Sequence, residues 1–135
     1  MAGFKELEVW QLGRTLATRM YEWSYNFPAS EQFGLTAQIR RAAISIPSNV
    51  AEGYGRRHDS DYARFLRIAK GSLNELETLA ILAEDLGLGV FDEETQALIS
   101  TVGSKLTNVI SRIQPGLIRE SVSVYDSDGL SDVHD

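Results

Sequence analysis

The sequence has 135 residues and no cysteine. This absence excludes disulfide bonds, thiolate catalysis and cysteine-ligated zinc. Long apolar runs are also missing, because no uninterrupted stretch approaches the length that a membrane-spanning helix needs. The first residues, "MAGFKELEVW", carry acidic groups where a signal peptide has a long apolar segment. We therefore expect a cytoplasmic protein with no membrane partner.

Histidine is scarce as well, since His58 and His134 are the only two in the chain. No group of His, Asp and Glu has metal-ligand spacing on a predicted helix face, so we expect no metal and no cofactor. The stretch "GYGRR" lacks the second half of a phosphate-binding loop. His58 follows two arginines and has the chemistry of a general base near a phosphate. A solvated loop histidine is the better interpretation, because no predicted partner orients its ring.

The charge of the chain is unevenly distributed around a net value of −6. Residues 120–135 contain five acidic residues and no Lys or Arg, whereas residues 40–70 contain seven basic residues against three acidic ones. The terminal segment is also rich in Ser, Asp and Gly, which is typical of disorder. We therefore divide the chain into a helical domain over residues 1–119 and an acidic, disordered tail over 120–135.

Apolar residues recur at steps of three and four along most of the chain, which is typical of packed helices. Pro28 should end the first helix, Ser60 and Asp92 should act as N-caps, and Gly53 and Gly55 should give the second helix a flexible exit. The helices are predicted over about residues 5–27, 35–54, 60–86 and 92–113. Four long helices with short links predict an all-α fold, an antiparallel, left-handed, up-down-up-down four-helix bundle.

The second and third predicted helices are apolar on two sides. A helix with two apolar sides is buried on both, but a four-helix bundle covers only one side of each helix. Another subunit is the natural cover for the second side, and a wide core stripe is the alternative for the third helix. We expect an oligomer in which Ile44 and Leu79 lie at the subunit interface.

Polar residues interrupt the pattern of the second helix in the stretch "RAAISIPSNVAEG", residues 41–53, around a predicted kink at Pro47. In an antiparallel hairpin, Arg41 lies level with Glu75, and Ser45 lies level with Ser72. A catalytic or ligand site is one interpretation of these groups. A buried polar network that fixes helix register is the interpretation we prefer. Its predicted members are Arg41, Ser45, Asn49, Glu52, Ser72 and Glu75.

Basic residues gather at the predicted turn between the second and third helices. Clustered cations are sufficient to bind phosphates, and the symmetry of an oligomer would repeat the cluster. The alternative is a solubilising face, whose charge Asp59 and Asp61 would reduce. The predicted binding residues are Arg56, Arg57, Arg64, Arg67 and Lys70, the last three on the outer side of the third helix.

Residues 9–56, "VWQLGRTLATRMYEWSYNFPASEQFGLTAQIRRAAISIPSNVAEGYGR", and the later run "FLRIAKGSLNELET" resemble the 23S ribosomal RNA intervening-sequence protein family. They also resemble the related accessory variability determinant proteins of diversity-generating retroelements. The resemblance covers about residues 4–115. It implies a four-helix bundle that assembles into a homopentameric barrel. For the retroelement relatives it also implies binding of a reverse transcriptase and of nucleic acid through basic surfaces.

These observations lead to one preferred function and two others. We expect a non-catalytic, oligomeric helical bundle that binds RNA, DNA or a nucleic-acid-handling protein through its basic surface. The alternative is a protein–protein interaction scaffold with no nucleic-acid role. A ribonuclease that uses His58 comes third.

Overall fold

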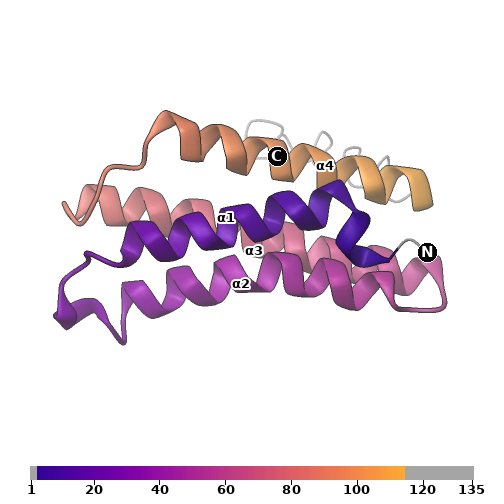
Figure 1. The fold of residues 1–135 in the computed structure, drawn as a ribbon, viewed down its shortest axis with the longest axis horizontal. Helices are drawn as coiled ribbons and strands as arrows, with labels where there is room; N and C mark the ends of the chain where they lie inside the picture. The colour runs from indigo at the N-terminus through magenta and orange to yellow at the C-terminus, as the bar shows by residue number, and fades with distance from the viewer. Residues whose placement is uncertain (1–2, 115–135) are drawn as a thin grey trace, which may run out of the picture.

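The computed structural model describes residues 3–114, which form four α-helices and two short 3-10 helices without a strand (Figure 1). The predicted all-α fold with four helices is confirmed. The predicted acidic tail, residues 120–135, lies outside the described residues. No helix within the described range is both long and apolar enough to cross a membrane. The elements are η1 (Phe4–Glu6), α1 (Glu8–Ser24), η2 (Ala29–Glu31), α2 (Leu35–Tyr54), α3 (Asp59–Asp85) and α4 (Glu93–Ile113).

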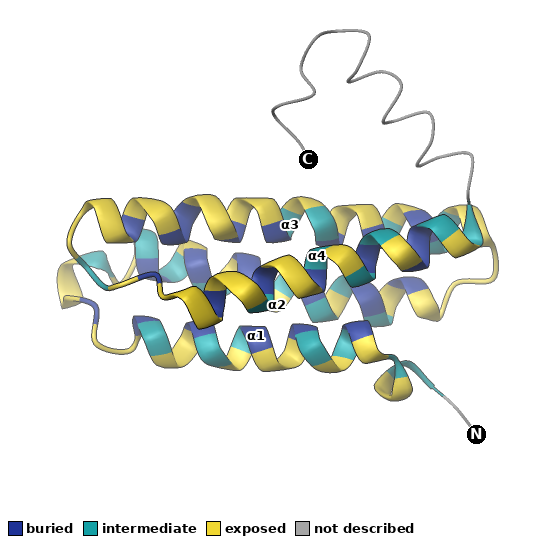
Figure 2. Cartoon of the chain, turned by 90° about the horizontal axis from the view of Figure 1, so that it is seen from above, coloured by how far each residue is buried: buried dark blue, intermediate teal, exposed yellow. Residues whose placement is uncertain are grey.

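The four helices lie along one another and bury one continuous apolar core. Helix α2 packs against α1 and α3, and α4 packs against the same two helices from the other side (Figure 1). Figure 2 shows the buried residues of each helix turned toward its neighbours and the exposed ones turned outward. The core includes Leu16 and Met20 of α1, Ile46 of α2, Leu66 of α3 and Leu106 of α4. These side chains come from the predicted three-and-four spacing, which puts one stripe of each helix inside.

The helix ends agree with the sequence in part. Helix α2 has the predicted bounds, and the Asp92 side chain accepts a hydrogen bond of 2.8 Å from the Thr95 amide, as its predicted N-cap role requires. Hydrogen bonding by the Thr95 side chain and by this amide holds the pKa of Asp92 below its usual value. Ser60 is not an N-cap, since α3 begins at Asp59 and therefore already includes Ser60.

A left-handed glycine, Gly87, follows the end of helix α3 at Asp85. Its φ is +75°, and this conformation lets the Leu88 amide donate to the Ala83 carbonyl at 2.9 Å. The Gly87 amide donates to the Glu84 carbonyl at the same distance, so two terminal carbonyls of α3 are satisfied.

Gly53 has a role other than the predicted flexible exit, because it is buried where α2 crosses the start of α3. A Cβ atom at this position would lie 2.8 Å from the Phe65 Cβ and 3.2 Å from the Tyr62 carbonyl oxygen. The absent side chain therefore allows the two helix backbones to approach closely. At the same turn the rings of Tyr54 and Tyr62 pack against each other.

We expect Gly53→Ala to lower the free energy of unfolding by about 1–3 kcal/mol, the usual cost of overpacking. Gly71→Ala is the matched control, because a Cβ there meets nothing within 4 Å. Gly71 lies inside α3, so that substitution should stabilise the protein by about 0.5–1 kcal/mol. Urea unfolding of the two variants measures both effects, and equal effects would contradict the close approach at Gly53.

Candidate nucleic-acid interface

The link between α2 and α3 comprises only residues 55–58 and lies at one end of the four helices (Figure 1). Gly55, Arg56, Arg57 and His58 are all exposed. His58 occupies the N-cap position of α3 without a hydrogen bond from its side chain to the helix. The short link holds its two arginines next to the first turns of α3, which carry further arginines.

Phe65 organises two of these arginines. The guanidinium carbon of Arg56 lies 4.7 Å from the centre of the Phe65 ring, and that of Arg64 lies 4.6 Å from it. Each arginine also forms an ion pair within its own helical segment: Arg56 with Glu52 at 2.7 Å, and Arg64 with Asp61 at 3.5 Å. Such exposed pairs contribute little stability, but together with the ring they orient both guanidinium groups.

Two tyrosines also lie at the α2–α3 end. Tyr54, the last residue of α2, packs edge-on against Tyr62 of α3 with ring centres 5.9 Å apart. Burial raises the pKa of the Tyr62 hydroxyl, and Tyr54 raises it further, whereas the charge of Arg112 lowers it. The last turn of α4, which contains Arg112, lies at the same end of the four helices (Figure 1). A cation from a third helix therefore joins the α2–α3 end.

Arg57 and Arg67 differ from the two arginines stacked on Phe65. Both are exposed, and within residues 3–114 no ion pair joins either of them to a carboxylate. Their charges are available to an external anion at the least electrostatic cost. We name the whole group the basic–aromatic end, which comprises Tyr54, Arg56, Arg57, Tyr62, Arg64, Phe65, Arg67 and Arg112.

Lys70 does not belong to this group, and its predicted place on the outer side of α3 is wrong. Its ammonium group donates a 2.7 Å hydrogen bond to the Thr107 hydroxyl of α4. The side chain is half-buried, and this burial lowers the pKa of Lys70. Lys70 therefore links α3 to α4 instead of facing a ligand.

The predicted polar network is present in its centre but not at its edges. The Ser45 and Ser72 hydroxyls lie 2.8 Å apart, and the Asn49 amide donates to the Ser45 hydroxyl and carbonyl, each at 2.8 Å. Arg41 and Glu75 are both exposed, and the described residues show no ion pair between them. The predicted contact between Arg41 and Glu75 is therefore not formed among the described residues.

Glu52 also lies outside this network, since its carboxylate pairs with Arg56 at the helix end. The group that joins α2 to α3 is thus a small one of Ser45, Asn49 and Ser72. It is only partly buried, and its donors and acceptors satisfy one another. This arrangement agrees with the structural interpretation of the network.

We expect Ser72→Ala to lower the free energy of unfolding by about 1–3 kcal/mol, because the Ser45 hydroxyl loses its partner across the helix pair. Glu75→Ala serves as the control on the same face of α3 and should change stability by about 1 kcal/mol or less. Thermal unfolding followed by circular dichroism measures both. A larger loss for Glu75→Ala than for Ser72→Ala would show that the charged pair, not the hydroxyl pair, joins the helices.

Arg40 is a structural residue that the sequence did not single out. Its Nε atom donates to the Ser24 hydroxyl at 2.9 Å, and Nη2 donates to the Tyr21 carbonyl at 3.3 Å. The guanidinium carbon also lies 4.6 Å from the centre of the Tyr21 ring. Arg40 therefore ties α2 to the last turns of α1, at the opposite end from the basic–aromatic end.

The two predicted interface residues have different surroundings. Ile44 is 44% exposed and lines a groove of about 410 Å³ between α1 and α2, with Trp10, Ala17 and Pro47 among its neighbours. Leu79 is only 8% exposed and belongs to the core of its own chain. The prediction that Leu79 faces another subunit is wrong, because its side chain packs among the core residues of its own chain.

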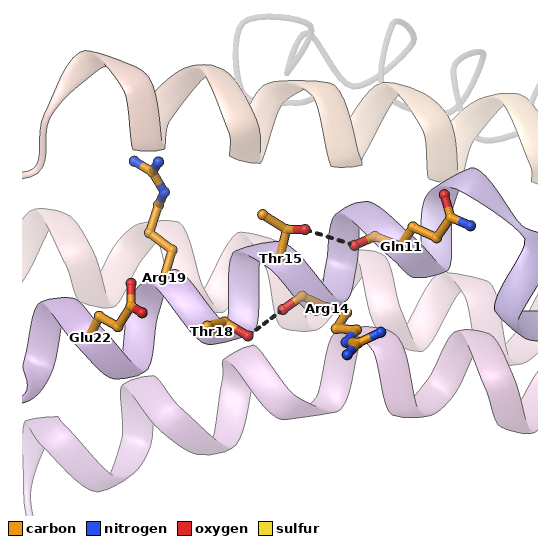
Figure 3. Close-up of a pocket in the computed structure, with 6 residues that line it drawn as sticks. All are labelled: Gln11, Arg14, Thr15, Thr18, Arg19 and Glu22. Atoms are coloured by element: carbon orange, nitrogen blue, oxygen red, sulfur yellow. Dashed lines mark hydrogen bonds between the residues drawn. The ribbon is translucent and has the colours of Figure 1, made fainter.

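A second depression lies along α1, with a volume of about 380 Å³ (Figure 3). Its hydroxyl groups are turned back to their own helix: Thr15 donates to the Gln11 carbonyl at 3.1 Å, and Thr18 donates to the Arg14 carbonyl at 3.0 Å. Arg19 points away toward α4, where it contacts Thr95 and Glu94. We assign no chemistry to this depression.

Residues 3–114 contain no group of three or more His, Cys, Asp or Glu side chains able to hold a metal ion. The second histidine of the chain, His134, lies outside the described residues. The groups that lie at the α2–α3 end of the described residues include cations and aromatic rings.

Sequence reasoning identifies the arginines of the turn but not Tyr54, Tyr62 and Arg112. Apolar spacing places Tyr62 in the core seam and Phe65 in the second apolar stripe, and Arg112 stands far away in the sequence. The only local signal is the run "ARFLR", in which an aromatic residue is flanked by arginines. The meeting of this run with Tyr54 and Arg56 depends on the turn and on Gly53.

Comparison with known protein families gives a match over most of the chain. The sequence model of the family described as 23S rRNA-intervening sequence protein matches residues 5–111. This range spans most of the chain and includes all of α1, α2 and α3. No curated protein matches the sequence.

Proposed function

The chain belongs to the family of 23S rRNA-intervening sequence proteins, and from this premise we propose that it is a non-catalytic, cytoplasmic protein that binds a nucleic acid or nucleoprotein partner. The proposal depends on the basic–aromatic end, where the α2–α3 link contributes Arg56 and Arg57 and the start of α3 contributes Arg64 and Arg67. Arg57 and Arg67 would meet phosphate groups, since no carboxylate among the described residues pairs with them.

Electrostatics support this choice of partner. Each phosphate that an arginine neutralises releases bound counterions, so affinity falls steeply as salt rises. Arginine also presents a planar fork of donors that fits a phosphate better than an ammonium group does. A nucleic acid offers phosphates at regular spacing, and the cluster offers arginines on two turns of α3 and on the preceding link.

We further propose that the helices form an antiparallel, left-handed, up-down-up-down bundle and that several chains assemble into a barrel, a homopentamer by the resemblance described above. The exposed Ile44 and its groove between α1 and α2 support an additional partner surface on the chain. Rotational symmetry would repeat the basic–aromatic end around the ring. The relation to accessory variability determinant proteins is part of the same proposal.

A protein–protein scaffold is the second candidate. The observation in its favour is the groove that contains Ile44, which Trp10, Ala17 and Pro47 make largely apolar. A groove of this kind suits an apolar side chain of another protein better than it suits a phosphate. In this alternative the arginines serve only to keep the surface hydrated.

A binding titration separates the two candidates. Fluorescence anisotropy with RNA at about 50 mM and about 200 mM salt should give an affinity that falls between them by an order of magnitude or more. The double variant Arg57→Gln, Arg67→Gln should weaken binding and reduce the salt dependence, whereas Arg14→Gln, an exposed arginine of α1, should change neither. Absence of any binding at low salt would favour the scaffold.

A further inference from the structure

The aromatic rings of the basic–aromatic end restrict the kind of nucleic acid that fits it. A cluster of cations alone attracts any chain of phosphates, and it attracts a duplex more strongly because a duplex has the higher charge density. Here Tyr54 is 38% exposed. The planar guanidinium groups of Arg56 and Arg64 lie over the Phe65 ring, at 4.7 and 4.6 Å from its centre. A planar nucleic-acid base can stack on aromatic rings and guanidinium groups of this kind.

Such a surface is useful only to a base whose face is accessible. In a duplex the faces of the bases are covered by their neighbours, and only their edges reach the grooves. In a single strand the bases can be splayed apart and stacked on aromatic rings or on the planes of arginine side chains. A single strand is therefore the nucleic acid whose phosphates can contact the arginines while its bases stack on the rings.

We propose that the basic–aromatic end binds single-stranded nucleic acid, with phosphates at Arg57 and Arg67 and bases stacked on the exposed ring of Tyr54 and on the Arg56 guanidinium over Phe65. This inference rests on the proposed function, which requires only that phosphates bind. It adds a ligand class, a strand with exposed bases, and a role for side chains that carry no charge.

The stacking surface is held in place before any ligand arrives. The backbone of Gly53 lies so close to Phe65 and Tyr62 that an added Cβ would come within 2.8 Å and 3.1 Å of their atoms. Ion pairs with Glu52 and Asp61 restrain Arg56 and Arg64. A preorganised surface loses less conformational freedom on binding, which favours the ligand that matches it.

The test uses the full chain and four labelled probes in anisotropy titrations at low salt. The first two are oligo(U) and oligo(dT) of about 12 nucleotides, in the range of single-strand site sizes. The third is a duplex of the same length, and the fourth is an abasic phosphodiester of equal charge. Stacking of one base should make a single strand bind about 5- to 150-fold more tightly than the abasic probe.

Two variants assign this preference to the aromatic side chains. Tyr54→Leu and Phe65→Leu keep every charge of the cluster, so they should bind the single strand about as weakly as the abasic probe is bound. Tyr25→Leu is the matched control, because Tyr25 is 80% exposed and follows α1 at the opposite end of the helices (Figure 1). Circular dichroism confirms that each variant is folded before it is titrated.

The outcomes distinguish the two levels of the proposal. The inference is supported if either single strand binds more tightly than the duplex and abasic probes, and if this preference is lost in Tyr54→Leu or Phe65→Leu and kept in Tyr25→Leu. The tighter binder of oligo(U) and oligo(dT) then shows whether ribose or deoxyribose is preferred. Equal binding of abasic and base-carrying probes overturns the inference and leaves phosphate binding intact. Failure of all four probes to bind overturns the proposed function itself.

Discussion

Leu79→Glu should abolish the folded state. Leu79 is 8% exposed in the core of its own chain, so the substitution would place a carboxylate among apolar side chains without a partner. The milder Leu79→Ala alone should lower the free energy of unfolding by about 2–5 kcal/mol, a large part of the stability of a domain of this size. The helical signal in circular dichroism should be lost for the glutamate variant at room temperature.

Ile44→Glu is the contrasting variant for the same experiment. Ile44 is 44% exposed, so a carboxylate at this position remains hydrated and the helical signal should be kept. If the groove between α1 and α2 contacts another copy of the chain, light scattering should show a smaller mass than for the unsubstituted protein. A native helical signal for Leu79→Glu would contradict its place in the core, and an unchanged mass for Ile44→Glu would contradict a subunit contact at the groove.

Deletion of residues 120–135 should strengthen nucleic-acid binding. These residues hold five acidic groups and no Lys or Arg, so their removal changes the net charge of the chain from −6 to −1. The last turn of α4 contains Arg112, whose charge acts on Tyr62 of the basic–aromatic end. We expect the gain at low salt to be on the order of tenfold, equivalent to about 1.4 kcal/mol.

Replacement of Arg56, Arg57, Arg64 and Arg67 by Gln in the shortened protein should remove this gain. For each arginine that no longer neutralises a phosphate, the slope of log affinity against log salt should become shallower by about 0.7 for a single strand. Titrations at low and high salt with and without the deletion measure both quantities. A gain that survives the four substitutions would show that the acidic residues act on another surface.

The helices themselves follow from local chemistry. Three-and-four spacing of apolar residues predicts the buried stripes, and the bounds of α2 agree with the sequence to the residue. The Asp92 cap and the left-handed Gly87 were also predictable, because each is determined by residues within a few positions in the chain. Such features need no knowledge of the neighbouring helix.

Features that depend on how helices rotate against each other were not predictable. The apolar pattern of α3 alone predicts Lys70 on the outer side of that helix. In the structure α4 lies close enough for its Thr107 hydroxyl to accept a hydrogen bond from Lys70. Arg41 and Glu75 are both exposed and form no ion pair among the described residues, whereas Ser45 and Ser72 do meet. Axial register can be counted along a sequence, but the rotation of each helix depends on packing over the whole core.

The basic–aromatic end shows the same division. Its arginines are neighbours in the sequence, so their clustering could be predicted from composition alone. The stacking of Arg56 on Phe65 depends on the short α2–α3 link and on the missing side chain of Gly53. The participation of Arg112 depends on α4, whose last turn lies at the same end of the four helices as the α2–α3 link (Figure 1).

Photo-crosslinking locates the nucleic acid on the protein most directly. A single-stranded RNA that carries 4-thiouridine is bound at low salt, irradiated and digested, and the crosslinked peptides are identified by mass spectrometry. We expect crosslinks within residues 54–67, above all at Tyr54, Tyr62 and Phe65, with none at the exposed Tyr25 of the opposite end. Crosslinks concentrated at Tyr25 or along α1, with none in residues 54–67, would contradict it.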